Sequence, residues 1–241
     1  LMSCTNNDDN SEWYGSEGIV FTTAIQSRVS GNTWNANDEV GIYMMNAGSG
    51  IEAATAQNKK VHCTDQRTLT AAPGNGIYLP ESGNVDFIAY YPYSETISDY
   101  KNYPIDLSNQ TKQNAIDLMT AVNLTNRQLA SPQGNLQFKH LLAKLVLNLK
   151  STSGSSLKGI KASISGLQVK GTANLSDGTI TPSGEATTFS LFINEEATQA
   201  EAILLPQDLS GKLKIKLEQN GQSKEIETEI SGNIEQGSKY I

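Results

Sequence analysis

Apolar and polar residues alternate in short runs along most of this 241-residue chain, and this period restricts its fold most strongly. A period of two places successive side chains on opposite faces of a β-strand. Clear runs lie at residues 18–26, 40–44, 85–93 and 213–217, and Gly, Asn and Pro separate them. About a dozen short strands without a long helical period are expected. The predicted fold class is therefore all-β, with two β-sandwiches in tandem.

The densest apolar run, residues 136–149, divides the chain. It is too short to span a membrane as a helix, and Lys139, His140 and Lys144 interrupt it. The pattern predicts a buried strand with a helical turn at residues 140–142. The stretch before this run is rich in aromatic residues and loops, whereas the stretch after it alternates more regularly.

Three parts of the chain follow from these patterns. Residues 1–17 are expected to form a polar tether behind the remnant of a signal peptide. Residues 131–134 carry a Ser-Pro-Gln-Gly turn signal, which marks a domain boundary. The predicted domains are an N-terminal β-sandwich at residues 18–134 and a C-terminal β-sandwich at residues 135–241.

Several local expectations can be compared with a structure. Residues 46–59 are expected to form a surface loop, and residues 77–79 a short strand. Residues 94–135 are expected to be irregular, with one helical turn near residues 115–121. The pair Asn-Gly at residues 220–221 lies between two alternating runs, which predicts a β-hairpin.

The charge pattern excludes two classes of partner. The chain has 25 acidic and 18 basic residues and a formal net charge of −7. No basic cluster exceeds a pair such as Lys59 and Lys60, so a nucleic-acid partner is not expected. Amphipathic basic helices are missing as well, so the membrane is expected to be reached only through an N-terminal lipid.

The residues that carry most enzymatic chemistry are scarce. His62 and His140 are the two histidines, and the zinc-protease, Cys-x-x-Cys and Gly-x-Ser-x-Gly patterns do not occur. No catalytic, metal-binding or cofactor-binding residue is predicted, and the protein is not expected to be an enzyme. We expect His140 to be a hydrogen-bonded structural residue. A hydrolase with a pair of carboxylates is the third and weakest functional class that the sequence leaves open.

The two cysteines have different contexts. Cys4 ends Leu-Met-Ser-Cys, the pattern of a bacterial lipoprotein signal, in which the thiol receives a diacylglycerol after cleavage. We therefore predict lipidation at Cys4. The alternatives are an accidental cysteine or a disulfide with Cys63. Cys63 lies in an alternating run and is expected to be a small buried hydrophobic residue.

An aromatic cluster gives one candidate ligand site. Tyr90, Tyr91 and Tyr93 follow Phe87 in the run at residues 85–93. Exposed rings of this kind could stack on a sugar, so the three tyrosines are a candidate platform for a glycan or a host protein ligand. The alternative is that the aromatic residues of this strand form core and rim.

Five segments of the chain, in this order, resemble conserved stretches of the fimbrillin family. These proteins are subunits of protease-matured (type V) pili of anaerobic gut and oral bacteria. The segments run from Trp34 to Tyr43, from Phe87 to Tyr93, from Asp117 to Ala121, from Phe138 to Leu145 and from Leu204 to Gln207. With Cys4 at the start, they give a resemblance over residues 18 to 210.

The resemblance implies two transthyretin-like domains, export as a lipoprotein to the outer membrane and cell surface, and assembly of a fimbria with other pilus subunits. In this family an Arg-specific protease cuts after the first strand, which leaves. The vacated groove then receives a donor strand from a neighbouring subunit, a form of β-augmentation. The corresponding cut here is after Arg28, and the displaced strand carries Ile19, Phe21 and Ile25. The alternative is that Arg28 is an ordinary exposed residue after a strand.

Alternatives to a polymerising subunit remain open. Family subunits continue beyond a tyrosine like Tyr240 into a further strand, whereas the given chain ends at Ile241. A truncated chain, a tip subunit that accepts a strand without donating one, and an uncut lipidated anchor are the three expectations. The runner-up function is a non-polymerising outer-membrane lipoprotein that binds a glycan or a host surface ligand.

Overall fold

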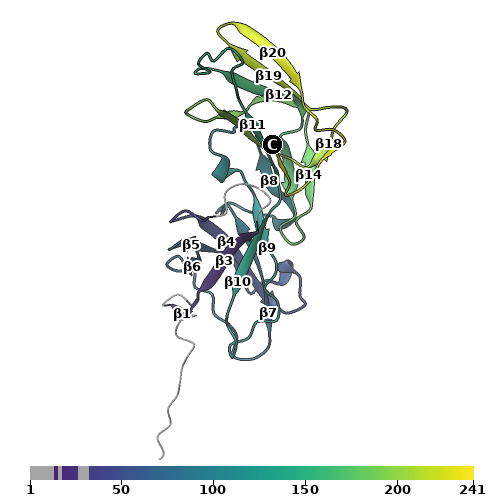
Figure 1. Ribbon diagram of the computed structural model, residues 1–241. Coiled ribbons are helices and arrows are strands. Elements are labelled where there is room, and N and C mark those ends of the chain that lie inside the picture. The colour runs from purple at the N-terminus through teal and green to yellow at the C-terminus, as the bar shows by residue number, and fades with distance from the viewer. Residues whose placement is uncertain (1–13, 16–17, 27–32) are drawn as a thin grey trace, which may run out of the picture. The chain divides into compact units, whose positions relative to one another are not determined.

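The computed structural model describes residues 14–15, 18–26 and 33–241 (Figure 1). It is 47% strand and 4% helix, with several sheets, which confirms the all-β class. The tandem transthyretin-like arrangement stays a prediction. Within the described ranges, no helix is long and apolar enough to cross a membrane.

The described residues form two compact units. The first unit contains the residues up to Ile25, Thr33–Thr96 and Ala121–Phe138, and the second contains Ile97–Thr120 and Lys139–Ile241. Residues 97–120 thus group with the C-terminal half, whereas the predicted boundary at residue 134 assigns them to the N-terminal half. The domain boundary itself stays a prediction.

Seven strands, most of whose residues belong to the first unit, pair in the closed order β10-β3-β6-β5-β4-β7-β9. A short ladder, β1 paired with β2, precedes it in the chain. The bounds are β1 (Tyr14–Gly15), β2 (Gly18–Ile19), β3 (Phe21–Gln26), β4 (Glu39–Asn46), β5 (Ala56–Cys63), β6 (Thr68–Ala71), β7 (Val85–Tyr91), β9 (Met119–Ala121) and β10 (Asn135–His140). The apolar runs at residues 18–26, 40–44 and 85–93 therefore form β2 with β3, β4 and β7, as predicted.

The second unit contains several smaller sheets, in the orders β16-β17-β11-β22, β15-β12-β19-β20, β14-β13-β8 and β18-β21. The bounds are β8 (Tyr103–Asp106), β11 (Ala143–Asn148), β12 (Lys161–Leu167), β13 (Lys170–Ala173), β14 (Ile180–Ser183), β15 (Thr187–Ser190), β16 (Phe192–Ile193), β17 (Gln199–Leu204), β18 (Gln207–Asp208), β19 (Lys214–Gln219), β20 (Gln222–Glu227), β21 (Asn233–Ile234) and β22 (Lys239–Tyr240). The predicted hairpin joins β19 to β20, with positive φ at Asn220 (51°) and Gly221 (78°). Two successive positive φ values are what a type I′ turn requires.

The central apolar run differs from the prediction in one respect. It forms two strands, β10 and β11, and a buried bend at Leu141 and Leu142 replaces the predicted helical turn. The bend lets the chain leave the ladder with β9 and enter the ladder with β17. Pairing with different partner strands on the two sides explains why one continuous apolar run is not one strand.

Three other local predictions were wrong in detail. Residues 46–59 contain the 3₁₀ helix η2 (Ile51–Ala53) and the start of β5. The predicted strand at residues 77–79 is a single bridge at Ile77. Residues 94–135 contain β8, β9 and two 3₁₀ helices, η3 (Tyr100–Asn102) and η4 (Gln113–Ala115). Strands this short depend on their partners for stability, so their local patterns carry little signal.

Candidate functional site: the seat of the first strand

Every second side chain is buried along β2 and the first half of β3. Ile19, Phe21 and Thr23 are 1%, 0% and 6% exposed, whereas Ile25 is half-buried and Ala24 is exposed. Of the three apolar residues predicted for the displaced strand, two are therefore fully enclosed. We call the groups that receive β2 and β3 the first-strand seat: Trp34, Leu69, Ile77, Phe87 and Gly134.

Backbone pairing with Ile77 fixes the beginning of this strand at Gly18 and Ile19. The N–H of Ile19 donates to the carbonyl of Ile77 at 2.8 Å, next to a parallel bridge between Gly18 and Ile77. Gly18 has φ of +89°, and a Cβ there would lie 2.1 Å from the Ile77 carbonyl oxygen. A residue with a side chain would therefore strain the backbone and collide with the seat.

Both edges of β3 are paired along its buried part. On one side Phe21 pairs with Leu69, and the N–H of Thr23 donates to the carbonyl of Arg67 at 2.7 Å. On the other side the N–H of Thr22 donates to the carbonyl of Gly134 at 2.9 Å. Removing the strand would therefore leave unpaired backbone groups on two neighbouring segments.

The ring of Phe21 occupies the apolar centre of the seat. It packs edge-on against Phe87, with the ring centroids 5.1 Å apart. Gly134 lies beside it, because a Cβ at that position would be 3.1 Å from Cδ1 of Phe21 and 2.9 Å from Cδ1 of Leu124. The close packing of Phe21 therefore requires the glycine at position 134, for which the sequence predicts only a place in a turn.

Gly134→Ala is expected to destabilise the first unit by about 1–3 kcal/mol, because the added methyl group overpacks the contact with Phe21 and Leu124. The measurement is urea denaturation. Gly211→Ala is the matched control, since a Cβ there meets nothing within 4 Å. Equal stability of the two variants would contradict the close packing of Phe21 against Gly134.

Trp34 connects the seat to the rest of the first unit's core. Its side chain is 3% exposed, and its indole N–H donates to Oγ1 of Thr23 at 3.1 Å. The ring is edge-on to Tyr91 and Phe138, with centroid distances of 5.2 and 5.0 Å. Sequence reasoning singled out Trp34 only as part of a family motif and missed its contact with β3.

Tyr90 and Tyr91 at the end of β7, together with Tyr93 beyond it, do not form an exposed surface of three rings. Tyr90 and Tyr91 are 0% and 8% exposed, and Tyr93 is half-buried. The hydroxyl of Tyr90 donates to Oδ1 of Asn58 at 2.7 Å, while Nζ of Lys60 lies 5.1 Å from the ring centroid of Tyr93. These tyrosines follow the core-and-rim alternative, since two rings are enclosed and cannot stack on a ligand.

Two predicted site residues, Cys4 and Arg28, lie outside the described residues. Lipidation and proteolytic maturation there stay predictions. Cys63 is a buried free thiol, as expected for a small hydrophobic residue, and burial raises its pKa.

His140 is buried and lies beside the carboxylate of Asp117. It is 6% exposed, and its Nδ1 lies 3.0 Å from a carboxylate oxygen of Asp117. The hydrogen bond expected of His140 is confirmed. Within the described residues, no group of three or more His, Cys, Asp or Glu side chains could hold a metal ion.

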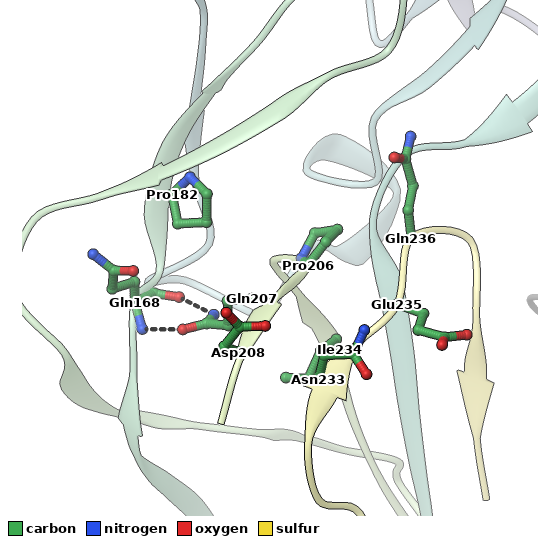
Figure 2. A pocket seen from close by; sticks show the side chains of 9 residues that line it. All are labelled: Gln168, Pro182, Pro206, Gln207, Asp208, Asn233, Ile234, Glu235 and Gln236. Carbon is green, nitrogen blue, oxygen red and sulfur yellow. Dashed lines mark hydrogen bonds between the residues drawn. The ribbon is translucent and has the colours of Figure 1, made fainter. Parts of the chain in front are cut away.

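The second unit contains an open groove of about 630 Å³ (Figure 2). The residues that line it are Gln168, Pro182, Pro206, Gln207, Asp208, Asn233, Ile234, Glu235 and Gln236. Two reciprocal hydrogen bonds of 2.9 Å join the Gln207 amide to the backbone N–H and carbonyl of Gln168. These bonds fix Gln207, the last residue of the fifth family-like segment, as part of the groove wall.

The sequence is similar to a known family and to a named relative. Residues 27–241 match the family described as fimbrillin-like. A Bacteroides uniformis protein named "Putative fimbrium subunit Fim1C" is 32% identical over 215 residues, which cover 86% of this chain and 71% of that protein.

Two crystal structures have a similar fold. A "putative cell adhesion protein" from Bacteroides uniformis is 30% identical, with a TM-score of 0.79 and coverage of 91% of this chain and 89% of that chain. A second, from Bacteroides ovatus, is 21% identical, with a TM-score of 0.70 and coverage of 89% and 87%. The protein is thus an all-β chain that shares its fold with these two structures. It belongs to the fimbrillin-like family, which confirms the resemblance of its five segments.

Proposed function

We propose that this protein is a structural subunit or adhesin of a bacterial surface fimbria, in which a strand from a neighbouring subunit replaces the first strand. Membership of the fimbrillin-like family and the relative named as a fimbrium subunit support the fimbrial role. The single observation that carries strand replacement is the enclosure of Ile19 and Phe21 between two paired edges.

The energetic consequence of losing this strand favours its replacement. Burial of a large apolar side chain contributes roughly 1.5–3 kcal/mol, so the buried face of residues 18–26 contributes on the order of 5 kcal/mol. That value is comparable to the free energy of unfolding of a whole domain. An emptied seat would also expose the carbonyls of Ile77 and Gly134, which an incoming strand could pair again.

The proposal includes maturation and export. Lipidation of Cys4 would carry the protein to the outer membrane, and an Arg-specific protease would release the first strand by cutting after Arg28. The two tandem domains would have the transthyretin-like topology of the family. No enzymatic activity, cofactor or nucleic-acid partner is part of the proposed role.

Limited digestion with an Arg-specific protease tests the maturation step. The chain has three arginines, Arg28, Arg67 and Arg127. The backbone of Arg67 is paired with β3, and Nε of Arg127 donates to the carbonyl of Thr125 at 3.0 Å. We expect one cut, after Arg28, followed by oligomers in size-exclusion chromatography.

The control for this digestion is Arg28→Gln, which should remain an uncut monomer. A cut after Arg67 or Arg127 in preference to Arg28 would contradict the proposed maturation site. A cut chain that stays an inert monomer would instead favour a non-polymerising lipoprotein that binds a glycan or host ligand.

A further inference from the structure

The buried face of the first strand contains one polar position between apolar ones. Thr23 follows Ile19 and Phe21 at a spacing of two, and is 6% exposed. Its hydroxyl oxygen accepts a hydrogen bond of 3.1 Å from the indole N–H of Trp34, and both groups are buried. An apolar residue at position 23 would continue the alternation equally well, so apolar packing alone does not account for the threonine.

Trp34 has a strong requirement for this acceptor. The indole N–H is a donor with no acceptor capacity, and a buried donor without a partner is costly. The rings of Tyr91 and Phe138 make T-shaped contacts with the indole and offer it no other strong acceptor there. Trp34 lies outside β2 and β3 and packs against Tyr91 and Phe138. It would therefore remain in place when the first strand leaves.

Burial limits which side chain at position 23 can accept the hydrogen bond from Trp34. A carboxylate at position 23 would accept the hydrogen bond, but burial of its charge would be strongly unfavourable. A short neutral hydroxyl, such as that of Thr or Ser, accepts this hydrogen bond without burying a charge.

We propose that Trp34 is a specificity-determining residue of the seat and selects partner strands with Thr or Ser two residues after a large buried side chain. This inference rests on the proposed strand replacement and defines the partner by its pattern, apolar-x-aromatic-x-Thr/Ser. A strand with Val at the last position fills the same space but leaves the indole N–H unpaired.

Peptide competition on a cut chain tests this selection. A sequence-specific protease site inserted after Gly31 makes the cut independent of Arg28. Peptides with the sequence of residues 18–26, unchanged or with Thr23→Val, then compete for the cut protein, and native mass spectrometry measures their bound ratio. We expect the Val peptide to bind about tenfold more weakly, from the cost of one unsatisfied buried donor.

Two controls make the result specific to Trp34. In a Trp34→Phe protein the preference for Thr23 over Val should disappear. The second control is a Thr22→Val peptide. The Thr22 hydroxyl donates to the carbonyl of Gly134 at 3.2 Å and not to Trp34. Its substitution should therefore weaken binding by the same factor in the unchanged protein and in Trp34→Phe.

The outcomes separate this inference from the proposed function. Equal binding of the Thr23 and Val peptides would overturn the selection by Trp34 and leave strand replacement intact. A preference that persists in Trp34→Phe would also overturn it. If no peptide enters the cut protein, both strand replacement and selection fail.

Discussion

Phe21→Ala is expected to lower the free energy of unfolding by about 3–5 kcal/mol, the range for truncating a fully buried aromatic residue. Phe21 is 0% exposed and packs edge-on against Phe87 at 5.1 Å. The truncation removes this contact and leaves a cavity beside Gly134, which has no side chain to fill it. Urea denaturation, followed by circular dichroism, measures the change.

Phe192→Ala is the matched control, because Phe192 is 36% exposed. Because more than a third of its surface stays in water, its truncation should cost about 1–2 kcal/mol, less than that of the fully buried Phe21. If Phe21→Ala destabilises the protein no more than this control, apolar burial does not hold the first strand in its seat. The driving force for refilling the seat would then be missing.

Gln110→Leu should have a comparably large effect in the second unit. The Gln110 side chain is 3% exposed and makes three hydrogen bonds. Its Nε2 donates to the carbonyls of Leu107 and Ile203 at 2.8 and 3.0 Å, and its Oε1 accepts from the N–H of Ile203 at 2.8 Å. Leucine would leave these buried backbone groups unpaired, at a cost of about 2–4 kcal/mol.

Limited proteolysis and urea denaturation together check this second prediction. Residues 97–120 should become sensitive to protease in Gln110→Leu, because the amide joins this segment to β17. Gln222→Leu is the control, since Gln222 is exposed on β20 and should change stability by less than about 0.5 kcal/mol. Unchanged stability in Gln110→Leu would contradict the role of this amide in holding the segment.

The alternating pattern predicted the longer strands and their buried faces. A period of two places Ile19, Phe21, Thr23 and Ile25 on one face of the first strand. The structure buries the first three and leaves Ile25 half-buried. The hairpin at residues 220–221 was predicted because positive φ at both positions suits Asn and Gly. Period and turn chemistry are local properties, so one sequence contains enough information for them.

The short strands could not be predicted in the same way. β8 has four residues and β9 has three, and both lie in the stretch expected to be irregular. β8 forms because its backbone pairs with β13, from Tyr103 opposite Ala173 to Asp106 opposite Lys170. Pairing over such a sequence distance leaves no local period, which also explains why residues 97–120 group with the second unit.

The candidate site was only partly accessible to sequence reasoning. The run of tyrosines at residues 90–93 allows two interpretations, because a strand buried on both faces and a strand with an exposed aromatic row have similar sequences. The structure encloses Tyr90 and Tyr91. The hydrogen bond from Trp34 to Thr23 joins residues eleven positions apart, and no period of a strand or turn predicts it.

Native mass spectrometry of the protein after Arg-specific digestion tests strand replacement most directly. The digested protein is mixed with an excess of an isotope-labelled peptide with the sequence of residues 18–26. Strand replacement predicts that the mass of the N-terminal fragment disappears from the complex and that the mass of one labelled peptide appears. A complex that keeps its own fragment and takes up no peptide would contradict the exchange of the first strand.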